Sequence, residues 1–562
     1  MVEASVVIPT YNRAERLHAC LTALQRQTQA ASHFEVVVVV DGSTDGTAEM
    51  LAGLRPQYAL RVIEQPNLGQ CVALNRGVAE AQGALCIILD DDISACPELV
   101  AEHLHLHQER RDVVGIGQLA LRLPPDADWF ARHFARDWGA HYGDLNRGER
   151  QPDWEDCFSG NMSVARAALL EAGGFAADLR RSFDVELAFR LKARGHAFAY
   201  LPRALGYQDE RKGFTELAAD SEKAGAASVE LYRRHPATLP TLLGRFAAAK
   251  LRWKLSSRLL LTFNVSPASV KRLARLFGQR GRTYAWYRAL HRYCFWRGVR
   301  QALPDDDTWQ RLTYGVPILA YHAFGADGEA PKRFIVPRRR FKRQMTCLKW
   351  MRYCVLGLDE YLRCLREHRL PPARSVVITI DDGYADNWFV AHPVLRRYRY
   401  PATVFLVSDY LGTDNRWDQQ SELTGRPLLS WSNVQEMLRN GIQIGAHTRT
   451  HPRLTTLSSE TARTEIEGSR AALEQGLGVP VLAFCYPYGD HNPAILTMAD
   501  QAGFLGSCTV LPGLNSPVTP LHALRRIEIY GRDSLLQFAI AVLSGERLQT
   551  LWKSIRRWQP SA

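Results

Sequence analysis

The chain has 562 residues, a formal net charge of +12 at pH 7 and a hydrophobic content of 46%. Its length exceeds what one hydrophobic core usually serves, so two or three domains are expected, and its composition is that of a globular protein. The positive charge suits an anionic partner such as a nucleotide diphosphate or an acidic membrane face. Nucleic acid is disfavoured, because the chain lacks zinc-finger spacings, RNP-like aromatic stretches and unbroken Lys/Arg blocks.

The cysteines and the N-terminus indicate a compartment. The 11 cysteines form no C-x-x-C pair and are scattered through apolar runs, which is typical of reduced core thiols. The N-terminal segment has no basic region followed by an apolar region, and no apolar run reaches the roughly 18 residues of a membrane span. We therefore expect a cytoplasmic protein, with contact to the inner face of the membrane as an open alternative.

The first predicted domain, residues 1–235, begins as an alternation of strands and helices. Short β-branched runs at 5–8, 36–40 and 85–89 are separated by helical patterns at 15–27, 45–54 and 71–81. Continuous apolar strands that alternate with helices are typical of a parallel sheet buried on both faces. We predict an α/β domain with a mostly parallel sheet, in which ligands bind at the carboxyl ends of the strands.

Polar features follow each of these three strands. They are the segment 9–12, which contains Pro9 and Tyr11, then Asp41 with its turn, and then the acidic triplet 90–92. Each alone is more often a turn or a solvated loop. Together they suit a nucleotide-sugar, because Tyr11 can stack on a base, Asp41 can accept a base N–H, and carboxylates can hold Mg²⁺ or Mn²⁺ against a diphosphate.

This region resembles the inverting family 2 glycosyltransferases with the Rossmann-like GT-A fold. The resemblance implies transfer from a nucleotide-sugar, such as a UDP-sugar, to a glycan or lipid-linked saccharide. It implies that Pro9, Tyr11 and Asp41 bind the nucleotide, and that Asp90 and Asp92 form the metal and ribose site. The matching segments are VVIPTYNR (6–13), VDGSTDGT (40–47), NLGQCVALNRG (67–77), LDDD (89–92), SGNMSVARAALLEAGGF (159–175) and FDVELAFRL (183–191).

Asp184 falls where this family places its general base. A carboxylate opposite the departing nucleotide can take the proton of the acceptor hydroxyl in one inverting displacement. The alternative is an acid in the first turn of a helix, favoured there by the helix dipole. The chain departs from the family pattern at Val40, Leu74 and Phe183. No Q-x-x-R-W segment follows Asp184, which favours addition of one sugar over processive synthesis.

Residues 236–313 are predicted to form a basic helical connector. Aromatic, aliphatic and basic residues recur at helical spacing in this stretch. Such a helix could lie on anionic lipid, or it could cap the first domain while its Arg and Lys stems cover the protein surface. Both interpretations stay open.

The second predicted domain, residues 314–545, again places polar motifs at strand ends, and a basic tail (546–562) follows it. Strand-like runs at 316–321, 375–380, 402–407, 442–445 and 481–486 alternate with helical patterns at 341–350, 433–440 and 459–475. A distorted (β/α) barrel collects active-site residues at one rim in this way. His447 and His451 lie on a loop, and with Asp382 they make a three-ligand set that leaves an open position on a Zn²⁺ ion.

This half resembles the polysaccharide deacetylases of carbohydrate esterase family 4, also called NodB-like. The resemblance implies removal of an acetyl group from an N-acetylhexosamine. It implies that Asp381 is the catalytic base, that Asp382, His447 and His451 bind Zn²⁺ or another divalent metal, and that the Tyr488 N–H helps to hold the oxyanion. The matching segments are PILAYH (317–322), VVITIDDGYADN (376–387), LLSWSNVQEM (428–437), GAHTRTHPRL (445–454) and FCYPYGD (484–490).

Three departures accompany this resemblance. Cys485 stands where the family usually has an arginine that orients the base, and Arg526 is a candidate for part of the role of the missing fourth motif. His522 is the nearest candidate for the acid that protonates the leaving amine. The sequence therefore predicts a bifunctional enzyme. The alternative is an active glycosyltransferase whose second domain only binds glycan.

Overall fold

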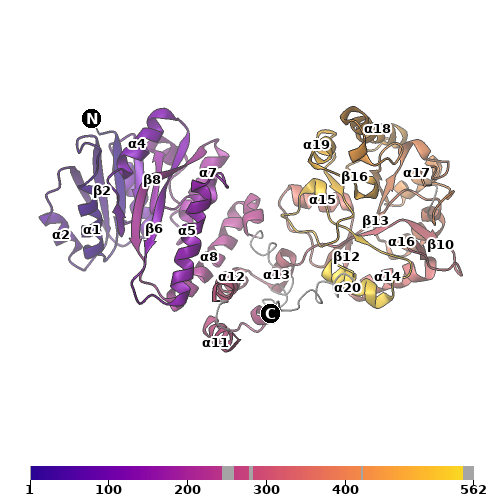
Figure 1. The fold of residues 1–562 in the computed structure, drawn as a ribbon, viewed down its shortest axis with the longest axis horizontal. Helices are drawn as coiled ribbons and strands as arrows, with labels where there is room; N and C mark the ends of the chain where they lie inside the picture. The colour runs from indigo at the N-terminus through magenta and orange to yellow at the C-terminus, as the bar shows by residue number, and fades with distance from the viewer. Residues whose placement is uncertain (1, 243–258, 278–282, 419–421, 548–562) are drawn as a thin grey trace. The chain divides into compact units, whose positions relative to one another are not determined.

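The chain folds into two compact units. A computed structural model describes residues 2–242, 259–277, 283–418 and 422–547, and Figure 1 shows its elements. The first unit comprises residues 1–234 with 250–302, and the second comprises residues 235–249 with 303–562. Among the described residues, no helix is both long and apolar enough to cross a bilayer.

The first unit is built on an eight-stranded sheet of order β3-β2-β1-β4-β7-β6-β8-β5. The pairs among β1 to β4 are parallel, as predicted, whereas β7 runs antiparallel to both of its neighbours and β5 runs antiparallel to β8. The sheet is therefore mixed in its second half. Its strands are β1 (Ala4–Thr10), β2 (Phe34–Asp41), β3 (Ala59–Gln65), β4 (Leu85–Leu89), β5 (Ile93–Ala95), β6 (Val113–Arg122), β7 (Asn161–Ala165) and β8 (Ala197–Asp209).

Helices cover both faces of this sheet. Every residue of β1, β2 and β4 is buried, which explains their nearly continuous apolar sequence. Two apolar clusters, one on each face, form the core. The helices are α1 (Ala14–Leu24), α2 (Thr47–Gly53), α3 (Gln70–Glu80), α4 (Leu99–Glu109), α5 (Trp129–Asn146), α6 (Arg166–Glu171), α7 (Phe183–Ala193), α8 (Phe214–Arg234), α11 (Pro267–Phe277) and α12 (Thr283–Ala302).

Much of the predicted connector packs onto the first unit. Helix α12 lies against α8 at a crossing of two glycines. A Cβ at Gly298 would come within 1.8 Å of the Glu222 carbonyl oxygen, and one at Gly225 within 2.0 Å of the Phe295 carbonyl oxygen. Only glycine permits this approach. For α12 the structure therefore favours the helical cap over the lipid-facing helix, while 243–258 and 278–282 lie outside the described residues.

The second unit is a curled, open parallel sheet, which confirms the predicted distorted barrel. The strand order is β17-β16-β15-β14-β13-β9-β18, with β12 paired to the first half of β13 and a separate β10-β11 ribbon. The strands are β9 (Ile318–Tyr321), β10 (Ala323–Gly325), β11 (Ile335–Pro337), β12 (Cys354–Leu356), β13 (Ser375–Ile380), β14 (Thr403–Leu406), β15 (Gln443–Ala446), β16 (Ala483–Cys485), β17 (Gly506–Cys508) and β18 (Ile527–Glu528).

Helices of the second unit begin and end at recognisable caps. Ser458 caps α18 through the Thr461 N–H, and Gly478 ends that helix in the left-handed conformation. Ser430 and Ser534 form capping boxes before α17 and α20. The helices are α13 (Asp306–Thr313), α14 (Arg338–Trp350), α15 (Leu358–Arg366), α16 (His392–Tyr398), α17 (Trp431–Arg439), α18 (Ser459–Leu477), α19 (Pro493–Gln501) and α20 (Leu535–Ser544).

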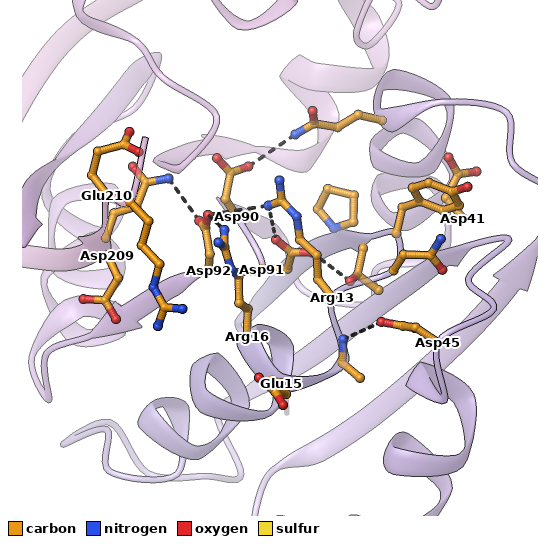
Figure 2. A pocket seen from close by; sticks show the side chains of 18 of the residues that line it. Arg13, Glu15, Arg16, Asp41, Asp45, Asp90, Asp91, Asp92, Asp209 and Glu210 are labelled. Atoms are coloured by element: carbon orange, nitrogen blue, oxygen red, sulfur yellow. Dashed lines mark hydrogen bonds and ion pairs between the residues drawn. The ribbon is translucent and has the colours of Figure 1, made fainter. Parts of the chain in front are cut away.

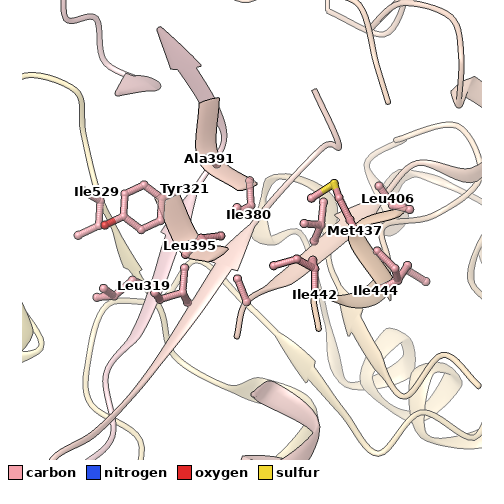
Figure 3. Close-up of a cluster of buried hydrophobic side chains, with 14 of the residues drawn as sticks. Leu319, Tyr321, Ile380, Ala391, Leu395, Leu406, Met437, Ile442, Ile444 and Ile529 are labelled. Carbon is pink, nitrogen blue, oxygen red and sulfur yellow. The ribbon is translucent and has the colours of Figure 1, made fainter. Parts of the chain in front are cut away.

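The main core of this unit lies between the outer face of the sheet and these helices. Figure 3 shows side chains of β9, β13, β14 and β15 pointing toward Leu395 of α16 and Met437 of α17. The helices thereby hold the strands in register. The carboxyl ends of β13, β15 and β16 then lie together at one rim, where the predicted catalytic motifs begin.

Candidate active sites

The first unit contains a cavity of about 980 Å³ at the carboxyl edge of its sheet. Its walls come from the ends of β1, β2, β4 and β8, so segments far apart in sequence meet there, as Figure 2 shows. The predicted residues Pro9, Tyr11, Asp41, Asp90 and Asp92 all line it.

Asp41 holds the loop that precedes α3. Its buried carboxylate accepts hydrogen bonds from the Gln65 side chain and from the Leu68 and Gly69 N–H groups, each at 2.8 Å. A carboxylate offers about four acceptor positions. One position is left for a ligand N–H, so base recognition by Asp41 stays a prediction, and loop positioning is an additional role that the sequence did not indicate.

The three acids of the triplet differ in their partners. Asp91 is buried and accepts hydrogen bonds from Thr10 at 2.8 Å and from Arg13 at 2.9 Å. Asp92 faces Arg16 at 3.4 Å and accepts a hydrogen bond from Gln208 at 3.1 Å. All three acids line the cavity, but Asp91 is buried whereas Asp90 and Asp92 are partly exposed to it.

The electrostatic surroundings of Asp90 suit a bound cation. Burial, followed by the charges of Asp92 and Asp91, raises the pKa of its carboxyl to about 7. Clustered carboxylates that resist ionisation bind a divalent cation favourably, because the cation removes their repulsion. The oxygen-only donor set of Asp90 and Asp92 fits Mg²⁺ or Mn²⁺.

Asp184 lies in the first turn of α7, as its alternative interpretation predicts. Its carboxylate accepts hydrogen bonds from the Ser159 N–H at 3.0 Å and the Val185 N–H at 2.9 Å. Burial raises its pKa, and its charge in turn contributes to the raised pKa of Asp90. It does not line the cavity itself, so its role as a base stays a prediction.

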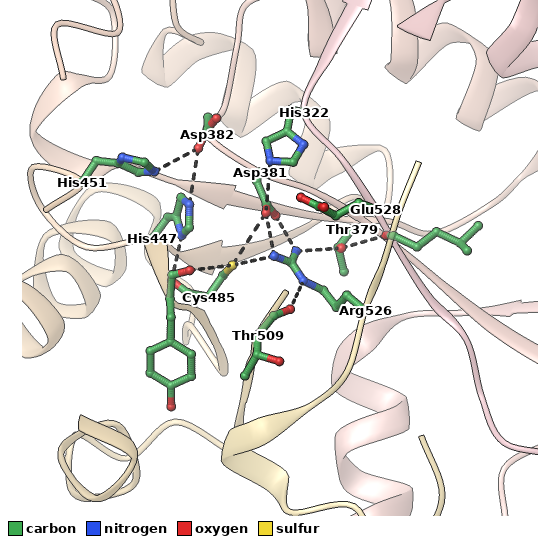
Figure 4. A network of polar contacts seen from close by, with 12 residues as sticks. His322, Thr379, Asp381, Asp382, His447, His451, Cys485, Thr509, Arg526 and Glu528 are labelled. Atoms are coloured by element: carbon green, nitrogen blue, oxygen red, sulfur yellow. Dashed lines mark hydrogen bonds and ion pairs between the residues drawn. The ribbon is translucent and has the colours of Figure 1, made fainter. Parts of the chain in front are cut away.

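In the second unit, Asp382, His447 and His451 converge at the rim. One oxygen of Asp382 lies 3.3 Å from Nε2 of His447 and 3.3 Å from Nε2 of His451. All three side chains are buried, and their ligand atoms lie within 4.8 Å of one another, as Figure 4 shows. Burial alone would raise the pKa of Asp382, but the hydrogen bonds from both imidazoles hold it well below its ordinary value.

The orientation of His447 fits a metal. Its Nδ1 lies 2.7 Å from the Cys485 carbonyl oxygen, to which it must donate a hydrogen bond. In the neutral tautomer that keeps the proton on Nδ1, Nε2 has a lone pair for a cation that would take the place of its present contact with Asp382, and a second partner of this kind is usual for metal-binding imidazoles. Two imidazoles and one carboxylate are a common zinc ligand set.

Asp381 forms a buried ion pair with Arg526. The two guanidinium nitrogens donate to the two carboxylate oxygens at 2.7 Å each, and Arg526 is 1% exposed. Burial alone would raise the pKa of Asp381, but the charge of Arg526 holds it below its ordinary value. Arg526 also donates to the Cys485 sulfur at 3.1 Å. Arg526, which directly precedes β18, thus orients Asp381, the predicted base, beside the cysteine that stands in the family's arginine position.

Backbone conformations at this rim are unusual. Asp382, His451 and Tyr488 have φ values of 71°, 65° and 59°, in the left-handed region that non-glycine residues rarely adopt. Such conformations cost free energy and persist where the surroundings enforce them, commonly at functional sites. The Tyr488 ring packs on His451 with centroids 4.8 Å apart, and Trp417 stacks on the same imidazole at 4.8 Å. These aromatic rings form walls beside the predicted metal site.

His522, the predicted proton donor, contacts Ser507 at 3.0 Å and Asp500 at 3.2 Å. Among the described residues it forms no hydrogen bond or ion pair with Asp381 or with the three predicted metal ligands. His322 does lie in this cluster, with Nε2 at 3.9 Å from Asp381 and a partly exposed side chain (Figure 4). His322 belongs to the PILAYH segment but was not predicted to have a role, although its place directly after an apolar strand was an available signal.

Known proteins resemble each half of the chain. The glycosyl transferase family 2 model matches residues 5–173, and the polysaccharide deacetylase model matches residues 368–506. The glycosyltransferase AglE of Haloferax volcanii is 41% identical over 231 residues, which are 41% of this chain and 73% of AglE. The validoxylamine A glucosyltransferase of Streptomyces hygroscopicus subsp. jinggangensis is 30% identical over 42% of this chain and 62% of its own length, less than two thirds. The Bacillus subtilis protein YxkH, named for polysaccharide deacetylase activity, is 28% identical over 42% of this chain and 79% of YxkH.

Proposed function

Because the chain belongs to the family 2 glycosyltransferases through residues 5–173 and to the polysaccharide deacetylases through residues 368–506, we propose that one polypeptide catalyses two successive modifications of a saccharide. The first unit transfers a sugar from a nucleotide-sugar, with a UDP-sugar as the preferred donor, to a glycan or lipid-linked acceptor. The second unit removes an acetyl group from an N-acetylhexosamine. The acceptor's lipid link and a location at the cytoplasmic face of a membrane are parts of this proposal.

In the first unit, the cavity with Asp41 at one end and Asp90 and Asp92 at the other supports the donor site. Tyr11 stacks on the base, while Arg13 and Arg16 attract the diphosphate. A divalent cation held by Asp90 and Asp92 would supply positive charge against the phosphates. Asp184 takes the proton of the acceptor hydroxyl as its oxygen bonds to the anomeric carbon and the bond to the nucleotide breaks on the opposite side, with inversion.

In the second unit, the proposal rests on the two hydrogen bonds that Arg526 donates to Asp381. They keep Asp381 ionised and aimed, so that this carboxylate can take a proton from the attacking water. A divalent cation held by Asp382, His447 and His451 would polarise the acetyl carbonyl. The Tyr488 N–H stabilises the oxyanion, and His322 gives a proton to the nitrogen as the C–N bond breaks, which releases acetate and a free amine.

The same observation weighs against a second unit that only binds glycan. The alternative was motivated by Cys485, because a base without its orienting arginine would be poorly placed. Arg526 supplies that guanidinium from the segment just before β18, and a pure binding module has no need to bury an aligned Asp–Arg pair.

Two assays on the purified chain test the proposal. Nucleotide release from UDP-sugars should fall strongly in Asp92→Asn, and unchanged release would refute the donor site. Acetate release from chitooligosaccharides should be lost in Asp381→Asn and should fall in His322→Ala, whereas His522→Ala should retain it. Acetate release by Asp381→Asn at the wild-type rate would refute the second activity.

A further inference from the structure

Three neighbouring helices of the second unit contain no acidic residue. Helix α14 packs against α20 on one side and against α16 on the other, and Figure 1 shows the three together. The sequences of α14 and α16 contain basic but no acidic residues, and α20 contains no charged residue at all. We call the exposed side of these helices the basic face.

The cations of the basic face are arranged in stripes. On α14 the exposed residues Arg339, Lys342, Arg343 and Lys349 recur at helical spacing, so they share one side of the helix. Arg396 and Arg397 are exposed on α16, and Thr346 of α14 is hydrogen-bonded to Tyr398 of α16 at 2.7 Å, which fixes the two stripes beside each other. An ion pair of Arg339 with Asp327 at 3.7 Å neutralises only the N-terminal end of the α14 stripe.

Large exposed apolar side chains lie on the same helices or next to them in the chain. Trp350 at the end of α14 is 83% exposed, Leu536 of α20 is 68% exposed, and Phe389 just before α16 is 66% exposed. Leu543 of α20 is half exposed, and with Trp350 it borders a cavity of about 450 Å³ whose rim also carries Arg352. Apolar side chains of this size are seldom left in water together on a monomer.

We propose that the basic face docks on an anionic lipid bilayer. The cations match the negative surface of such a membrane, while tryptophan, phenylalanine and leucine at the margin enter the region between headgroups and acyl chains. The inference is independent of the two activities proposed above, because none of these side chains belongs to either predicted site.

Charge argues against two other occupants from this chain. The segment after α20, residues 548–562, contains Lys553, Arg556 and Arg557 and no acid, and a second basic face is equally positive. Each would be repelled by the basic face. The helices also lie outside the sheet, whereas Asp381 and its partners lie at the rim of the strands. A bilayer on this face would leave the rim open to a substrate at the membrane surface.

The test is binding of the full chain to vesicles made of equal parts phosphatidylglycerol and phosphatidylcholine, compared with phosphatidylcholine alone. We expect binding only to the anionic vesicles, weakening with salt. Each Lys or Arg near such a surface contributes about fivefold to partitioning, so the triple change Lys342→Glu, Arg343→Glu and Arg397→Glu should weaken binding about 100-fold or more. Trp350→Ala with Leu536→Ala should weaken binding at high salt more than at low salt.

A matched control carries the same change in net charge elsewhere on the second unit. Arg363→Glu, Arg439→Glu and Arg463→Glu lie on α15, α17 and α18, and this variant should bind as wild type does. Circular dichroism and acetate release from a soluble substrate check that each variant is folded. The proposal fails if the wild-type protein does not bind anionic vesicles, if the control loses as much binding as the triple variant, or if neither variant changes binding. It also fails if soluble heparin competes as well as vesicles at equal charge, because the basic face would then be a general polyanion site.

Discussion

Removing the guanidinium that pairs with Asp381 should lower both the free energy of unfolding and the rate of deacetylation. In Arg526→Met the two 2.7 Å hydrogen bonds are lost and a buried carboxylate is left without its partner. Breaking a buried pair in this way costs about 3–5 kcal/mol of unfolding free energy. Loss of alignment of the base should lower kcat for acetate release by about 10²-fold. Urea unfolding and an acetate assay on the same preparations measure the two effects, with the exposed neighbour Arg525→Met as the matched control.

A double variant separates the two effects. Arg526→Met with Asp381→Asn removes the charge as well as its partner, so most of the lost stability should return while acetate release stays absent. Arg526→Met with Cys485→Arg places an arginine in the family's usual position, and it should recover part of the activity. The reasoning is refuted if Arg526→Met alone unfolds at the wild-type urea concentration, or if it deacetylates at the wild-type rate.

Three further predictions concern the metal, the donor loop and the core of the first unit. His447→Ala should lower the divalent metal content that elemental analysis measures in the absence of nucleotide, and it should abolish acetate release, while His491→Ala should retain both; an unchanged metal content in His447→Ala would exclude the proposed ligand set. Asp41→Ala leaves the 67–69 loop without its anchor, so the donor KM should rise about 10-fold or more, and an unchanged KM would contradict the loop role. Burial lowers the pKa of His103 to about 4. Between about pH 6.5 and pH 4 the imidazole is therefore protonated in the unfolded chain but not in the native chain, so the free energy of unfolding should decrease by up to about 3 kcal/mol as the pH is lowered. Urea midpoints at pH 7 and pH 5 measure about 2 kcal/mol of that fall, since pH 5 lies about 1.5 units below the unfolded pKa. His103→Gln should reduce this difference and the exposed His105→Gln should not.

The strand and helix pattern of the parallel regions was accessible from sequence. The runs at 85–89 and 375–380 coincide with β4 and β13, because buried parallel strands need apolar residues on both faces. The half-exposed strand β3 was not predicted, since its residues alternate in burial and leave no continuous apolar run. The antiparallel β7 was also missed, because strand direction depends on partners far away in the chain.

The sequence by itself determined which chemistry each half can perform, because a parallel sheet brings the carboxylates and imidazoles that follow its strands to one edge. Only the tertiary structure decided which side chains support that chemistry. Arg526 reaches Asp381 across 145 positions, and His322 rather than His522 lies beside it. Such pairings follow from the curvature of the sheet and the paths of its loops, which depend on packing across the whole unit and leave no local mark in the chain.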